Sequence, residues 1–197
     1  ELQTALDALA RGRTTITIAH RLSTIEIESA LVAHPEVIEA GVCPVPHETT
    51  EDLNERWWGE ASRRFSEETE NRLVVALSDA DLDLEATSTA RSRLNLANVL
   101  DTASQRNIPV LVVGPTPTLD EQRNARLAEL NAAYLDVADR RNHVYVDTFT
   151  PLVGHEQWRS DLASGQGRPG QAGHGLIAWL VLHRGWYQWL GLPEPTA

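Results

Sequence analysis

The stretch Ile108-Pro109-Val110-Leu111-Val112-Val113-Gly114-Pro115-Thr116-Pro117 decides the fold. Its Val-rich apolar run ends in a turn and is typical of a strand buried on both faces. From Leu119 to Arg141 apolar residues recur at helical spacing, which predicts an amphipathic helix with one buried face. Val144-Tyr145-Val146-Asp147 then has the pattern of a second short strand. A strand, a crossover helix and another strand predict a right-handed parallel unit.

The rest of the chain repeats this alternation. Apolar or β-branched runs predict further strands at 14–19, 37–42 and 72–77. Helices are expected at 1–11, 26–33, 49–65, 87–106, 119–141 and 170–190, with a long loop at 151–170. The pattern predicts an α/β fold: a flavodoxin-like three-layer sandwich around a five-stranded parallel sheet of order 2-1-3-4-5. We expect a single domain over 1–197, in which 1–48 is an atypical N-terminal segment.

Composition excludes several classes of function. The chain has 197 residues and a net charge of −11, which argues against a nucleic-acid partner. All 17 basic residues are Arg, so neither a Schiff-base lysine nor a phosphate-loop lysine is available. The single Cys excludes an internal disulfide, and the His spacing does not suggest a metal site. We therefore expect no metal and no cofactor.

Membrane and targeting signals are not visible in the sequence. No apolar run approaches the length of a bilayer span, and no signal peptide is visible. Met is absent even at position 1, which indicates a processed product, a fragment or an edited sequence. The expected location is cytoplasmic, or secreted after processing. The sequence does not indicate an oligomeric state.

Ligands of such sheets bind outside the carboxyl ends of the strands. That rule selects four segments, at 20–24, 41–47, 78–81 and 154–168.

From about residue 47 to 190 the chain resembles the SGNH/GDSL hydrolases, a family of esterases and lipases. The matching strings are His47-Glu48-Thr49-Thr50-Glu51-Asp52-Leu53 with Arg56-Trp57, Pro109 to Pro117, Asn124-Ala125-Arg126, Tyr145 to Leu152, and Pro169-Gly170-Gln171-Ala172-Gly173-His174. The resemblance covers roughly three quarters of the chain. It implies the same fold and a small ester or acyl substrate. It also implies a Ser nucleophile, a His base oriented by an Asp, and an oxyanion held by backbone N–H groups and an Asn.

The first catalytic positions of that resemblance are altered here. After the first strand the family has Gly-Asp-Ser-Leu, whereas this chain offers Ser23 as the nearest hydroxyl. The family's oxyanion Gly falls on Pro44, which has no N–H, and Gly41 replaces it only with a longer loop. The family's Gly-x-Asn-Asp falls on residues 78–81, which places Ala80 at the Asn position and keeps Asp81.

The acid and base positions are altered as well. The family's Asp-Gly-x-His-Pro falls on Gly165-Gln166-Gly167-Arg168-Pro169, so Gly165 stands at the acid position and Arg168 at the base position. His174 in the first turn of the last helix is the remaining candidate base. Ser23 and His174 also have plain structural interpretations, as a helix cap and as a packing residue respectively.

Within residues 1–48 two shorter resemblances occur. Residues 5–24 resemble the end of an ABC transporter ATPase, and residues 20–48 resemble the opening of the small domain of AMP-forming acyl-CoA synthetases. Neither function is possible here, because the phosphate-loop lysine and the catalytic lysine are both absent.

Two hypotheses of different class follow. The first is an SGNH/GDSL-type hydrolase of small esters or acyl groups with a degraded catalytic site and weak or no activity. The second is a non-catalytic binding or scaffold domain on the same fold. They differ in whether a Ser and a His meet at hydrogen-bond distance.

Overall fold

A computed structural model describes residues 14–19, 37–83 and 88–193, and for 14–19 it describes the backbone alone. The helices that the sequence predicts at 1–11 and 26–33, and the candidate nucleophile Ser23, lie outside these residues.

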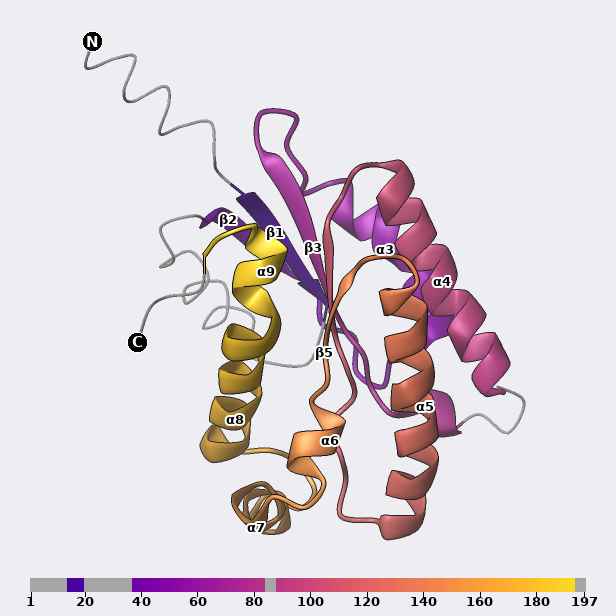
Figure 1. The fold of residues 1–197 in the computed structure, drawn as a ribbon, viewed down its shortest axis with the longest axis vertical. Coiled ribbons are helices and arrows are strands. Elements are labelled where there is room, and N and C mark those ends of the chain that lie inside the picture. The colour runs from indigo at the N-terminus through magenta and orange to yellow at the C-terminus, as the bar shows by residue number, and fades with distance from the viewer. Residues whose placement is uncertain (1–13, 20–36, 84–87, 194–197) are drawn as a thin grey trace, which may run out of the picture.

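Five strands form one sheet (Figure 1). They are β1 (Thr14–Ala19), β2 (Val37–Val42), β3 (Glu70–Ala76), β4 (Val110–Val113) and β5 (Val144–Val146). Their order is β2-β1-β3-β4-β5 and every neighbouring pair is parallel. The predicted α/β fold and strand order are confirmed. Val110 to Val113 are all buried, as a continuous apolar run predicts.

Helices cover both faces of the sheet. The helices α3 (Thr50–Ala61), α4 (Thr89–Gln105) and α5 (Glu121–Asp139) pack on one face, and α8 (Gln171–Val181), η2 (Leu182–Trp186) and α9 (Tyr187–Leu190) lie across the other (Figure 1). Alternate strand residues divide between the two cores: Val110 and Val112 pack toward α3 to α5, whereas Leu111 and Val113 pack toward α8 to α9. No helix within the described ranges combines the length and apolar character that crossing a bilayer requires.

The prediction of a long loop at 151–170 is wrong. The chain instead forms two short helices there, α6 (Phe149–Leu152) and α7 (Glu156–Ser164). His155 caps α7 by accepting a hydrogen bond from the Trp158 backbone N–H at 3.4 Å. Trp158 and Leu162, four residues apart, are both buried, and the Trp158 indole N–H donates to the Pro117 carbonyl at 3.1 Å. This pair lies on one face of α7 and packs into the core on the α8 side of the sheet.

The last helical region of the chain packs closely against the sheet at a glycine. Between α8 and α9 the turn widens into the π-helical segment η2, and Gly185 in this segment is buried. A Cβ added to Gly185 would lie 2.5 Å from Val146 Cγ2 and 3.0 Å from Leu111 Cδ1. The close approach of η2 to β4 and β5 therefore requires a residue without a side chain.

Two glycines of this helical region provide a matched test. We expect Gly185→Ala to lower the free energy of unfolding by about 1–3 kcal/mol, because the added methyl overpacks the core. Gly175 is an exposed position of α8, and an added Cβ there meets nothing within 4 Å. Gly175→Ala should therefore raise the free energy of unfolding by up to about 1 kcal/mol. Urea unfolding of both variants measures the difference. Equal effects of the two substitutions would contradict the packing described here.

Candidate active site at the carboxyl edge of the sheet

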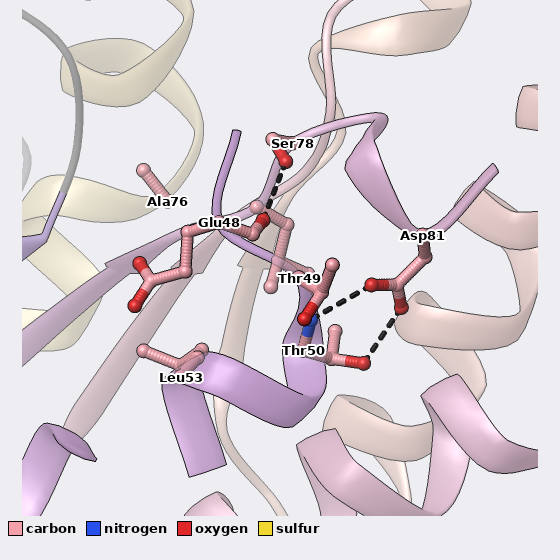
Figure 2. A pocket seen from close by; sticks show the side chains of 8 residues that line it. Glu48, Thr49, Thr50, Leu53, Ala76, Ser78 and Asp81 are labelled. Carbon is pink, nitrogen blue, oxygen red and sulfur yellow. Dashed lines mark hydrogen bonds between the residues drawn. The ribbon is translucent and has the colours of Figure 1, made fainter. Parts of the chain in front are cut away.

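Two loops meet beyond the carboxyl end of β3. One leads from β2 into α3 and carries Glu48 and Thr49, and the other follows β3 and carries Ser78 and the short helix η1 (Ala80–Asp83). A small pocket lies between them, lined by Glu48, Thr49, Thr50, Leu53, Ala76, Leu77, Ser78 and Asp81 (Figure 2). This is the edge at which a doubly wound α/β sheet binds its ligand.

Asp81 is the buried centre of this edge. Its carboxylate accepts hydrogen bonds from the Thr50 backbone N–H at 2.8 Å, the Thr50 hydroxyl at 2.6 Å and the Tyr134 hydroxyl at 2.8 Å (Figure 2 shows the first two). The side chain is 4% exposed, so the three donors replace water around the charge. Burial and the Asp81 charge hold the pKa of Tyr134 well above its ordinary value, which keeps the hydroxyl a donor. Asp81 therefore ties η1 to α3 and α5.

The N-terminus of α3 is fixed by hydrogen bonds that do not involve Asp81. Thr49 caps the helix by accepting from the Asp52 N–H at 3.1 Å, and the Asp52 carboxylate accepts in return from the Thr49 N–H at 3.1 Å. This reciprocal pair is a capping box. Glu48, just before it, is buried and forms an ion pair with Arg56 in the second turn of the helix.

Arg123 holds η1 from the other side. From the first turn of α5 its guanidinium forms ion pairs with Asp79 and Asp83, both at 2.6 Å, and donates to the Asp79 carbonyl at 3.0 Å. The hydrogen bond from Arg123 lowers the pKa of Asp83. Since the same pairs raise the pKa of Arg123, the guanidinium stays charged and the loop is clamped to α5.

Ala80 stands where the resemblance places an oxyanion Asn. Its side chain is buried, and its backbone N–H donates to Ser78 Oγ at 3.1 Å. The Ser78 hydroxyl in turn donates to the Glu48 carbonyl at 2.8 Å. Both groups are therefore engaged in holding the two loops together, and a methyl side chain offers no hydrogen bond to an oxyanion.

Residues 165–168, where the resemblance places the catalytic acid and base, form the end of α7. The Gly165 N–H donates to Asp161 O at 3.0 Å and the Gly167 N–H to Leu162 O at 2.8 Å. Gln166 and Gly167 have left-handed backbones, with φ of 53° and 83°. This is the geometry of a helix C-terminal turn. Arg168 follows with an exposed side chain.

His174 lies in the first turn of α8 and is half-buried. The nearby carboxylate is Asp161 of α7, which accepts hydrogen bonds from the Gly170 N–H at 2.6 Å and the Gly173 N–H at 2.9 Å. Asp161 therefore caps α8, whose own N-cap residue Gly170 has no side chain. Burial lowers the pKa of His174 and the Asp161 charge opposes that effect. The imidazole is therefore largely neutral at pH 7 and able to accept a proton.

The remaining candidate residues are not brought together by the described part of the chain. Gly41 lies inside β2, opposite Thr17 of β1, and its role as an oxyanion donor stays a prediction. Ser23 lies outside the described residues, so its distance from His174 is untested. Among the described residues, no group of three His, Cys, Asp or Glu side chains is placed to hold a metal ion.

Sequence reasoning missed three residues that shape this edge: Tyr134, Arg123 and Asp161. The helical spacing from Leu119 to Arg141 places Tyr134 among its apolar positions, but it does not indicate that the hydroxyl meets a carboxylate 53 residues away. Asp161 fell in a segment expected to be a loop. No local pattern identifies such partners, because Tyr134 and Arg123 contact elements distant in the sequence and Asp161 contacts the following helix across a turn.

The geometry defines a doubly wound α/β protein with a small pocket at the carboxyl edge of its sheet. A family model of the GDSL-like lipase/acylhydrolase family matches residues 19–176. The chain belongs to this family. The match begins inside the 1–48 segment that the sequence sets apart.

Solved structures share the fold at low sequence identity. A lipase/acylhydrolase from Enterococcus faecalis superposes with a TM-score of 0.68 at 19% identity, over 94% of this chain and 100% of that one. An acetylxylan esterase from Geobacillus stearothermophilus, solved as a catalytic mutant, gives 0.67 at 13% identity, over 95% and 98%.

Curated relatives match shorter stretches. The ATP-dependent lipid A-core flippase of Ralstonia nicotianae is 54% identical over 43 residues, 21% of this chain and 7% of that protein. The acetyl-coenzyme A synthetase of Rhodopirellula baltica is 34% identical over 113 residues, 52% of this chain and 16% of that protein. The chain therefore spans only a small part of the length of either relative.

The Asp81 contacts predict a large and graded effect on stability. Asp81→Ala leaves three donors unpaired in the interior and should lower the free energy of unfolding by about 3 kcal/mol or more. Tyr134→Phe removes one of these bonds and should cost about 1 kcal/mol. Exposed Asp139→Ala serves as the control, with a change within about 0.5 kcal/mol. Urea unfolding ranks the variants, and an Asp81→Ala effect as small as that of the control would contradict the network.

The helix-end turn at 165–168 predicts that the family's acid cannot simply be restored there. A Cβ added to Gly165 would lie 2.1 Å from the Arg168 carbonyl oxygen. Gly165→Asp should therefore lower the free energy of unfolding by about 1–3 kcal/mol and bring no gain in ester hydrolysis. Gly154→Asp, where an added Cβ meets nothing within 4 Å, is the matched control. A stable, more active Gly165→Asp variant would show that this turn is arranged differently.

Proposed function

We propose that this chain is an SGNH/GDSL-type hydrolase of small esters or acyl groups whose turnover is weak because its catalytic positions have changed. Family membership supports the reaction class, and the proteins that share its fold include a lipase/acylhydrolase and an acetylxylan esterase. The observation that supports weak turnover is the turn at 165–168, which ends α7 and presents neither an acid nor a base.

The chemistry explains why these changes matter. A serine hydroxyl is a poor nucleophile at neutral pH and needs a base to take its proton. Arg168 cannot serve, because a guanidinium stays protonated. Each donor aimed at the developing oxyanion contributes roughly 3–4 kcal/mol to the transition state, and Ala80 supplies none from its side chain.

The remaining machinery that we propose is Ser23 as nucleophile and His174 as base. Ser23 is the hydroxyl that follows β1, at the position nearest to the family's nucleophile. His174 stands at the start of α8 with a lowered pKa and the Asp161 carboxylate in its electrostatic surroundings. The charge of Asp161 favours the imidazolium that forms when His174 accepts a proton.

Steady-state kinetics with p-nitrophenyl acetate and butyrate test this proposal. We expect slow hydrolysis by the unmodified chain, lowered at least about tenfold by Ser23→Ala and by His174→Ala. His183→Ala removes an exposed imidazole from the adjoining segment η2 and should leave the rate unchanged. The rate should fall on acidification through the pKa of His174, below the ordinary 6.5, because only the neutral ring accepts a proton.

Three outcomes would refute or redirect the proposal. Fast saturable turnover would show that the site uses residues not named here. Unchanged hydrolysis in Ser23→Ala would exclude that nucleophile. Complete absence of turnover, together with saturable binding of a non-hydrolysable ester analogue, would favour the alternative of a non-catalytic binding domain.

A further inference from the structure

A serine and a histidine meet at the end of the sheet opposite the candidate active site. Ser104 lies in the last turn of α4, and His143 immediately precedes β5. Ser104 Oγ and His143 Nε2 are 3.0 Å apart. Because β5 runs from this end toward α6 and the candidate active site, the pair lies at the amino-terminal edge of the sheet, away from that site (Figure 1).

The imidazole is held in place by its surroundings. The His143 backbone N–H donates to the Ala138 carbonyl at 3.1 Å, following Asn142 with its left-handed φ of 55°. The ring is half-buried and also hydrogen-bonds the Leu100 carbonyl, one turn before Ser104 on the same helix. Since a carbonyl only accepts, this bond favours a ring proton directed at Leu100.

The charge state of His143 suits a base. Burial lowers its pKa; the Leu100 carbonyl raises it, the Arg141 charge lowers it and Asp101 raises it. The two charged neighbours are paired with each other, since Arg141 contacts the Asp101 carboxylate at 2.7 and 3.0 Å. At pH 7 the ring is therefore predominantly neutral and has one nitrogen able to accept a proton.

We propose that Ser104 is a surface acyl-acceptor site, in which His143 Nε2 accepts the hydroxyl proton while Ser104 Oγ attacks an activated acyl donor. The donors are aryl esters, thioesters or acyl phosphates. The Oγ–acyl bond forms as the bond from the acyl carbon to the leaving group breaks, and the leaving group departs with the electron pair. The proton passes to His143.

The site is open rather than enclosed. Ser104 is exposed, which allows a bulky donor to approach. Neither of the two pockets beside α3 is lined by Ser104 or His143. The expected product is therefore a stable O-acyl serine formed once per chain, not rapid turnover. This chemistry is independent of the hydrolase function proposed above.

The composition of the chain makes a clean assay possible. Without lysine, the usual competing amine side chains are absent. Trypsin releases residues 94–106 as one peptide in which Ser104 is the only serine. Ser164 provides an internal control: it is exposed and lies in the last turn of α7, but its hydroxyl contacts the Ser160 and Asp161 carbonyls at 3.1 and 2.9 Å instead of an imidazole.

The experiment incubates the full chain with p-nitrophenyl acetate at pH 7.5 and follows acetylation of each peptide by mass spectrometry. Ser104 should acetylate at least about tenfold faster than Ser164, because a positioned base contributes about 10²–10⁴-fold to such steps. His143→Gln should remove most of this advantage, and Ser104→Ala should abolish labelling of the 94–106 peptide.

Several results would overturn the proposal. Equal acetylation of Ser104 and Ser164 in the unmodified chain does so without any variant. Undiminished Ser104 labelling in a folded His143→Gln protein, verified by circular dichroism, also does so. Labelling of Thr102 in place of Ser104 within the same peptide would assign the reaction to a residue without an imidazole partner.

Discussion

The carboxylate of Asp81 is the interaction on which the carboxyl edge of this sheet depends. It is buried, and it receives hydrogen bonds from a backbone N–H, a threonine hydroxyl and a tyrosine hydroxyl on two other elements. A buried charge with one partner removed is strongly destabilising, so these groups constrain one another. With Arg123 clamping the far side of η1, the loop after β3 is held to both α3 and α5.

The contacts of Asp81 are structural in character. Asp81 occupies the last position of the family's four-residue string after β3, and it performs a structural task that does not require catalysis. Ala80 beside it and the helix-end turn at 165–168 also satisfy local backbone geometry. Neither offers a group that transfers a proton. The contacts that hold these two loops are present, and at Ala80 and in the turn at 165–168 the chain supplies neither an oxyanion donor side chain nor a base.

The sequence predicted what local pattern controls. The run 108–113, the helix at 119–141 and the strand at 144–147 follow from apolar periodicity, and the structure shows all three. The helix α7 was missed because only Trp158 and Leu162 mark its buried face among polar and small residues. The partners of Asp81 and the helix-capping role of Asp161 depend on tertiary contacts, which one sequence does not reveal.

The proposal of a family fold around a weakened catalytic site is tested most directly by the reactivity of Ser23 itself. An alkyl fluorophosphonate phosphonylates a serine that a base and an oxyanion site activate. A weakened site predicts slow, incomplete labelling of the tryptic peptide 22–56, which contains Ser23. Rapid, stoichiometric phosphonylation of Ser23 would contradict it and show that the site is fully assembled.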